Sequence, residues 1–169
     1  MKVIIASDIH GNLEYTKKLE ELCNKEKIDK LVLLGDILHN YMYYDSDEEN
    51  KVANILNKFT KIIIAVKGNC DRDYEGMKLN FSLSNGIDKI DLDNHSYFIT
   101  HGHIDYDIDN YDAFVGHTHV YNLEGKHINP GSVGLPRNHK EHTCIMYEND
   151  VLKLIDLDNF KEIGRRELK

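Results

Sequence analysis

Two histidines separated by a single residue stand at the end of an apolar segment, where GHTH at 116–119 follows AFV. If that segment is a strand, His117 and His119 point to the same face, because side chains alternate along a strand with a period of two. Two imidazoles on one face suggest a metal ion. The pair alone is weak support, since the chain has ten histidines and some must fall close together by chance.

Polar residues also follow the three apolar runs KVIIAS, KLVLLG and KIIIAV, in the motifs DIH, GD and GNCD. Such runs are typical of parallel strands that are covered on both faces. Ligands of open α/β sheets bind at the carboxyl ends of the strands, so we expect the polar residues to converge. With HGH after the predicted strand SYFIT, seven potential metal ligands stand at strand ends: Asp8, His10, Asp36, Asn69, His101, His117 and His119.

The seven side chains mix oxygen and nitrogen ligands. Asp8 and Asp36 supply anionic oxygen, Asn69 supplies an amide oxygen, and the histidines supply nitrogen, a mixture suited to Mn, Fe, Zn or Ni. Calcium would prefer oxygen alone. The number of ligands is sufficient for two metal ions. A zinc ion held only for structure is the alternative, but such sites close with four ligands that are rich in cysteine.

Two amphipathic segments between the apolar runs predict helices, at roughly Leu13 to Lys25 with Asn12 as the N-cap, and at roughly Glu49 to Phe59. The first half therefore reads as βαβαβ. In the second half, Asp93-Asn94 joins IDKIDL to SYFITHG, and Asn149-Asp150 joins CIMYE to VLKLIDL. These turn residues between short apolar segments predict hairpins.

The length and composition favour one mixed α/β domain spanning residues 1–169. Acidic residues outnumber basic ones by 29 to 21, which argues against a broad basic surface for tracking along nucleic acid. Three widely separated cysteines give no disulfide framework and suit a reducing compartment. Because no apolar run is long enough for a signal peptide or a membrane span, we expect a cytoplasmic protein that does not bind membranes.

The motifs DIH, GD, GNCD, HGH and GHTH, in this order and followed by NPGSVGLPR at 129–137, resemble those of the calcineurin-like metallophosphoesterases. More narrowly, the chain is similar to the small YfcE type of bacterial and archaeal phosphodiesterase over nearly its whole length. The resemblance implies an α/β fold of the α+β sandwich kind, with two mixed β-sheets flanked by helices in a four-layer architecture. The predicted βαβαβ start and hairpins agree with it.

The same resemblance assigns the ligands to two metal ions. It places Asp8, His10 and His119 on one ion, Asn69, His101 and His117 on the other, and Asp36 as a bridge between them. Mn is the expected metal, with Fe, Zn or Ni as alternatives. Paired ions of this kind hold a water or hydroxide nucleophile for an in-line displacement. The implied function is a dinuclear metal-dependent phosphodiesterase that hydrolyses small phosphodiesters.

The resemblance also implies catalytic roles for Asp36, Asn69, Cys70 and His103. Cys70 stands where many relatives have a histidine that assists the leaving group. A thiol with an ordinary pKa of about 8.5 is a poorer proton donor in this role than an imidazolium. For His103 the sequence leaves open whether it contacts the phosphate, orients a metal ligand or is only structural. The NPGSVG segment is expected to be a turn that supports the site.

Two segments depart from the family pattern, and both are expected to border the site. LHNYMYYDSDEEN at 38–50 carries three tyrosines instead of Gly and Pro, and IDYDIDNYDAFV at 104–115 leaves little room for the usual helix. We expect a small phosphodiester substrate rather than duplex nucleic acid, because an acidic rim disfavours long polyanions. The tyrosine-rich segment also suits an interface, so a homodimer or a higher homo-oligomer is expected.

Two other functions remain open on the same fold. A phosphomonoesterase or nucleotidase would use the same metal chemistry. A non-catalytic scaffold like the retromer subunit is the second alternative, but a scaffold should have lost some metal ligands, and none of the seven positions is altered.

Overall fold

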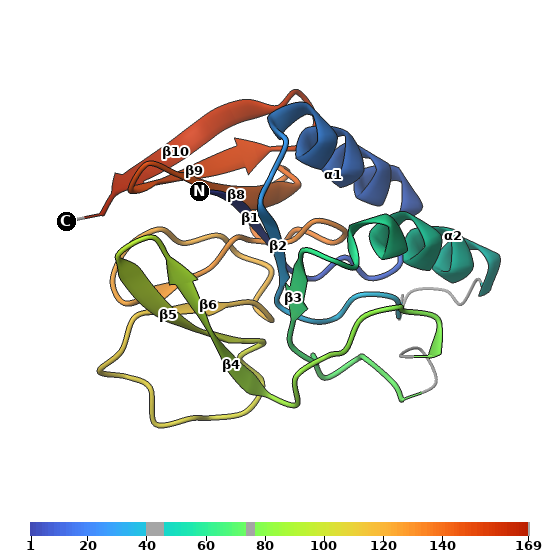
Figure 1. Cartoon of the computed structure of the whole chain (residues 1–169), viewed down its shortest axis with the longest axis horizontal. Coiled ribbons are helices and arrows are strands. Elements are labelled where there is room, and N and C mark those ends of the chain that lie inside the picture. Colours follow the sequence, from blue (N-terminus) through green and yellow to red (C-terminus); the bar gives the residue numbers. More distant parts are fainter. Residues whose placement is uncertain (40–45, 74–76, 169) are drawn as a thin grey trace.

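The structure is a computed structural model that describes residues 1–39, 46–73 and 77–168 (Figure 1). Its elements, in chain order, are β1 (Lys2–Ala6), α1 (Leu13–Glu26), β2 (Lys30–Leu33), α2 (Ser46–Leu56), the 3-10 turn η1 (Asn57–Phe59), β3 (Ile63–Ala65), β4 (Ile87–Leu92), β5 (His95–Thr100), β6 (Ala113–Val115), β7 (His127–Ile128), β8 (Thr143–Glu148), β9 (Val151–Asp156) and β10 (Lys161–Glu167).

The first half forms the predicted βαβαβ unit. β1 pairs with β2, and β2 pairs with β3, both in parallel. The side chain of Asn12 accepts a hydrogen bond from the backbone N–H of Tyr15 and so caps α1, as predicted. The carboxyl ends of β1, β2 and β3 consequently lie at one edge of the sheet, where the polar motifs follow them.

The predicted hairpins divide between two sheets. β8 pairs antiparallel with β1, and β9 and β10 extend the sheet to the order β10-β9-β8-β1-β2-β3. The hairpin of β4 and β5 turns at Asp93 and belongs to a second sheet of order β4-β5-β6-β7. β5, β6 and β7 run parallel to one another, so His101 and Gly116 leave the same edge of the second sheet.

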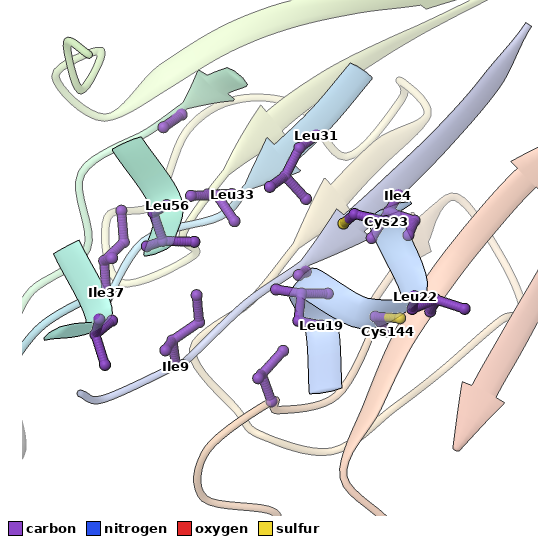
Figure 2. Packing of buried hydrophobic residues seen from close by; sticks show 14 of the residues in the cluster. Ile4, Ile9, Leu19, Leu22, Cys23, Leu31, Leu33, Ile37, Leu56 and Cys144 are labelled. Atoms are coloured by element: carbon purple, nitrogen blue, oxygen red, sulfur yellow. The ribbon is translucent and has the colours of Figure 1, made fainter. Parts of the chain in front are cut away.

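Apolar side chains pack on both faces of the six-stranded sheet. One face packs against α1 and α2 and the other against the four-stranded sheet (Figure 1). Figure 2 shows Leu19 and Cys23 of α1 in the same cluster as Ile4 of β1. The neighbouring Ile5 belongs to the opposite cluster. β1 is therefore buried on both faces, as its continuous apolar run predicted.

The fold class is confirmed as a sandwich of two mixed sheets with few helices. Both helices of the described chain cover the same sheet. Between β5 and β6, residues 101–112 form bends and turns, because this polar segment is too short for a packed helix. α2 begins at Ser46, before the predicted start at Glu49, and gives way to η1 after Leu56. Among the described residues, none of the helices has the length and apolar character needed to cross a membrane.

Candidate metal centre

Three of the predicted ligands meet beyond the ends of β1 and β6. The Oδ1 atom of Asp8 lies 3.2 Å from Nε2 of His119 and 3.7 Å from Nε2 of His10. The two Nε2 atoms are 3.3 Å apart, and all three side chains are buried. These three atoms lie close enough together to bind one metal ion, because the distance from a metal ion to a carboxylate or imidazole ligand atom is about 2.0 to 2.2 Å.

Asn69, His101 and His117 form a second group. Nε2 of His101 lies 3.0 Å from Oδ1 of Asn69 and 3.3 Å from Nδ1 of His117. His101 is buried, whereas Asn69 and His117 are exposed. The two histidines of GHTH thus face different groups, which is the division that the family resemblance implied.

Asp36 lies between the two groups. Its Oδ2 atom is 3.6 Å from Nε2 of His10 and 3.3 Å from Nε2 of His101. Its Oδ1 atom accepts a hydrogen bond of 2.7 Å from the backbone N–H of Cys70. The seven predicted side chains therefore surround one centre, with the Asp36 carboxylate placed between its halves.

Left-handed backbone conformations are concentrated at this centre. For residues other than glycine, each such conformation costs on the order of 1 to 3 kcal/mol and persists only where the surrounding structure imposes it. Backbone bonds between the loops after β1 and β2, such as that from the His10 N–H to the Asp36 carbonyl, impose it here. The φ angles are 54° for Asp8, 49° for His10, 52° for Asp36, 67° for His117 and 62° for His119.

Gly116 allows the end of β6 to lie against β1. A β-carbon at this position would fall 2.0 Å from Oγ of Ser7 and 3.1 Å from Oδ2 of Asp8. The backbone N–H of His117 donates to the same Oδ2 atom at 3.0 Å. Any larger residue at position 116 would push His117 away from Asp8, so the close approach requires glycine.

The loop at 129–137 supports the centre from outside, as the sequence predicted for NPGSVG. The Ser132 hydroxyl and the Gly134 N–H donate to the carbonyl oxygen of Asp8 at 2.8 and 3.0 Å. Each of these bonds fixes the backbone that carries the Asp8 carboxylate. The loop thereby contributes positioning, and its side chains are not among the candidate ligand groups of the described chain.

Backbone carbonyl oxygens orient three of the histidines. Each of these rings donates from Nδ1, which leaves a lone pair on Nε2 and turns that atom toward the carboxylates. Metal-binding histidines are commonly held in this way. The donors and acceptors are His10 to His39 at 2.8 Å, His101 to Leu34 at 2.7 Å, and His119 to Leu135 at 2.5 Å.

The donor set fits divalent cations. Oδ1 of Asp8 is buried and has no hydrogen-bond partner among the described residues. Burial raises the pKa of Asp8, but the imidazoles of His10 and His119 outweigh it and hold the pKa well below its ordinary value, so the carboxylate is charged. A buried anionic oxygen without a donor costs more than the penalty of about 1 to 3 kcal/mol for a neutral group. A bound cation would remove this cost.

These electrostatics predict opposite effects of pH on the metal-free and the metal-loaded protein. Burial lowers the pKa of His10 and His101, but Asp8 and Asp36 outweigh it and raise both. A raised pKa stabilises the fold below the unfolded-state value of about 6.5, and this contribution is lost as pH rises through the folded-state pKa. Metal binding needs neutral imidazoles and releases their protons, so it stabilises the fold more as pH rises.

Urea unfolding across this range checks the prediction. In the presence of a chelator, the contribution of the two histidines to the free energy of unfolding should fall as pH rises. With saturating Mn, the free energy of unfolding should exceed that of the chelated protein by an amount that grows as pH rises. The same pH slope in both conditions would contradict it.

Asp71 is a positioning residue that sequence analysis did not single out. Its carboxylate accepts hydrogen bonds from the backbone N–H groups of Asp36 at 2.8 Å, Ile37 at 2.7 Å and Gly68 at 2.8 Å. Burial, opposed by these three donors, raises the pKa of Asp71. Asp71 therefore ties the loop that carries Asp36 to the loop that carries Asn69. The feature of the sequence that could have identified Asp71 is its position as the last residue of the GNCD motif.

Cys70 and His103 lie at the margin of the centre. Asn69 donates from Nδ2 to Sγ of Cys70 at 3.2 Å. Burial and the negative charge of Asp36 raise the pKa of the Cys70 thiol to about 12. The His103 ring is exposed, and its centroid lies 5.4 Å from that of His101 and 6.3 Å from that of His117. Tyr41, Tyr43 and Tyr44 belong to the tyrosine-rich segment that was expected to border the site, and they fall outside the described residues.

Comparison with known proteins agrees with the geometry. Residues 1–150 match the calcineurin-like phosphoesterase superfamily domain. Phosphodiesterase YfcE of Escherichia coli strain K12 is 35% identical over 172 residues, which cover 94% of each chain. Phosphodiesterase MJ0936 of Methanocaldococcus jannaschii is 31% identical over 61% of this chain and 60% of its own length.

Solved structures show the same relationship. The structure of the phosphoesterase Yfce from E. coli superposes with a TM-score of 0.88 at 32% identity and covers 100% of both chains. Vps29 of Entamoeba histolytica, complexed with zinc, superposes with a TM-score of 0.68 at 17% identity over 100% of both chains, which shows a shared fold alone. By sequence and by structure, the chain belongs to the calcineurin-like phosphoesterase superfamily and is a phosphoesterase.

Proposed function

We propose that this phosphoesterase is a dinuclear metal-dependent phosphodiesterase that hydrolyses small phosphodiesters. The observation that carries the proposal is the position of Asp36, whose Oδ2 atom lies within 3.6 Å of a histidine from each ligand group. A carboxylate in this position can be shared by two cations. The similarity to proteins named phosphodiesterase YfcE supports action on a diester.

The chain's own residues would hold and orient the reacting groups. Asp8, His10 and His119 would bind one cation and Asn69, His101 and His117 the other, with Asp36 between them. When bound, such a pair of cations activates water and stabilises charge on both the attacking and the leaving oxygen. The protein fixes these ligands through Asp71, through the carbonyl groups on the histidines and through the strained strand ends, so that little reorganisation accompanies the reaction.

A small substrate follows from the charge of the protein. The formal net charge is −8, whereas binding of long nucleic acids depends on many Lys and Arg contacts to phosphate. Two divalent cations beside two carboxylates would leave a locally positive centre, which attracts one phosphodiester anion. Mn is the metal we expect in the active protein.

Metal analysis combined with a hydrolysis assay tests the proposal. The purified protein, reconstituted with Mn, should bind two ions per chain and hydrolyse bis-p-nitrophenyl phosphate faster than p-nitrophenyl phosphate. Faster hydrolysis of the monoester would identify a phosphomonoesterase or nucleotidase instead. If no common divalent metal supports turnover of either ester, the scaffold function is the better account.

Cys70 leads to a prediction about the leaving group. Because a thiol is a weak general acid at neutral pH, protonation by Cys70 should give little help to an alkoxide. We expect p-nitrophenyl diesters to react at least about a hundredfold faster than matched alkyl diesters, since general acid catalysis typically contributes that factor. Rates of a series of diesters that differ only in leaving group measure this.

The Cys70→Ala variant provides the control for the leaving-group series. It should retain activity on the aryl diesters. Equal rates for aryl and alkyl diesters in the wild-type protein would contradict a weak general acid.

A further inference from the structure

A cavity of about 390 Å³ opens beside the metal centre. His103 lines it, and the ring of His103 is 5.4 Å from that of the ligand His101. Gly102, the middle residue of HGH, and Val115, which directly precedes GHTH, line it as well. Pockets for small ligands start at about 300 Å³, so the cavity has room for an organic group attached to a phosphate at the centre.

The wall of the cavity is built around Tyr106. Its hydroxyl packs directly over Gly86, where an added β-carbon would fall 1.8 Å from Oη. The Thr100 hydroxyl, which also lines the cavity, donates to the carbonyl oxygen of Gly86 at 2.8 Å. The backbone N–H of Ile108 donates to the carbonyl of Tyr106 at 2.7 Å, which closes a tight turn in this wall. The segment after His103 is thus an ordered wall.

The polar lining combines two carboxylates with the imidazoles of His103 and His127. Asp105 and Asp109 contribute carboxylates, and no Lys or Arg lines the cavity among the residues that the structure describes. Lys126 lies outside the lining, and its ammonium group donates to the carbonyl oxygen of Asn110 at 2.7 Å. An anionic group in this cavity would meet two like charges, whereas a cationic group would meet two opposite charges beside an aromatic ring.

We propose that this cavity receives a cationic alkyl group of the substrate, such as an alkylammonium ester arm, and that Asp105 and Asp109 select for it. The inference rests on the proposed phosphodiesterase function, because the phosphate of the same molecule would lie at the metal centre. The preferred substrates are then zwitterionic diesters, with one negative charge on phosphorus and one positive charge on the arm.

Binding of choline tests the cavity without catalysis. Its neutral isostere, in which carbon replaces the quaternary nitrogen, is the comparison. In NMR titrations of the full chain, choline should shift the backbone amide signals of residues 103–109. Its Kd should be about fivefold lower than that of the isostere, because exposed charge pairs contribute free energies of about that size. The double variant Asp105→Asn/Asp109→Asn should lose the preference, and Asp107→Asn, on the same loop but outside the lining, should keep it.

A hydrolysis assay links the cavity to substrate choice. It compares two p-nitrophenyl phosphodiesters, one with choline as the second alcohol and the other with the neutral isostere. Both release the same leaving group, so the choline ester should show the lower KM with a similar kcat. Equal Kd values, equal KM values or a preference that survives in the double variant would each overturn the inference. If neither ester is turned over while choline binding behaves as expected, the phosphodiesterase function fails and the cation site stands.

Discussion

The Asp36→Ala variant should lose phosphodiesterase activity by more than about a hundredfold, the loss that removal of a supporting residue outside the coordination sphere already causes. Asp36 is placed between both ligand groups, with Oδ2 at 3.6 Å from His10 Nε2 and 3.3 Å from His101 Nε2. Its removal would take away the carboxylate that lies between the two ligand groups, and it would also free the backbone N–H of Cys70. Both metal ions should therefore bind more weakly.

Metal content after gel filtration and initial rates at saturating Mn measure this effect. Asp36→Asn keeps an oxygen that can accept from the Cys70 N–H, but it lacks the shared charge, so it should also bind less metal. Asp107→Asn, a change of one exposed carboxylate outside the centre, should retain both ions and full activity. An Asp36→Ala variant that still held two ions per chain would exclude a bridging role.

The Asp71→Ala variant should destabilise the metal-free protein by at least about 3 kcal/mol, because three buried backbone N–H groups would lose their acceptor at about 1 kcal/mol or more each. These N–H groups belong to Asp36, Ile37 and Gly68. They are the points at which two ligand-bearing loops are joined. We therefore expect a lower affinity for Mn as well, although Asp71 is not among the predicted ligands.

Urea unfolding in the presence of a chelator measures the loss of stability, and titration with Mn measures the affinity. Asp71→Asn keeps one acceptor oxygen and should lie between the wild type and Asp71→Ala in both measurements. Asp73→Asn is the matched control two positions along the chain, where an exposed carboxylate forms an ion pair with Lys67 at 2.7 Å, and should change neither. Wild-type stability in Asp71→Ala would falsify the positioning role.

The sequence alone predicted the local elements that carry the centre. The three apolar runs form strands, as predicted. β1 and β2 are buried because nonpolar residues without alternation are stable only when both faces of a strand are covered, whereas β3, at the edge of the sheet, is only partly buried. Asn12 caps α1 as its type and position require. The turn pairs Asp93-Asn94 and Asn149-Asp150 join antiparallel strands, and Asp93, Asn149 and Asp150 adopt the positive φ that Asn and Asp tolerate.

Long-range partners were beyond what the local pattern could decide. The hairpin of β8 and β9 joins β1, whereas that of β4 and β5 lies in the other sheet. Alternation within a hairpin specifies its buried face but not the sheet that covers it. β7 was not predicted, because two residues carry too little pattern to distinguish a strand from a loop.

For the candidate centre, too, local sequence determined some features and tertiary structure the others. The residue types and their positions at strand ends named the seven side chains, because ligand chemistry and the topology of parallel strands depend on local sequence. Only the tertiary structure decided that Asp36 lies between the two groups, that Asp71 joins their loops, and that the segment after His103 forms an acidic cavity. Each of these depends on contacts between residues distant in the chain, and their geometry is determined by the packing of the two sheets rather than by any one segment.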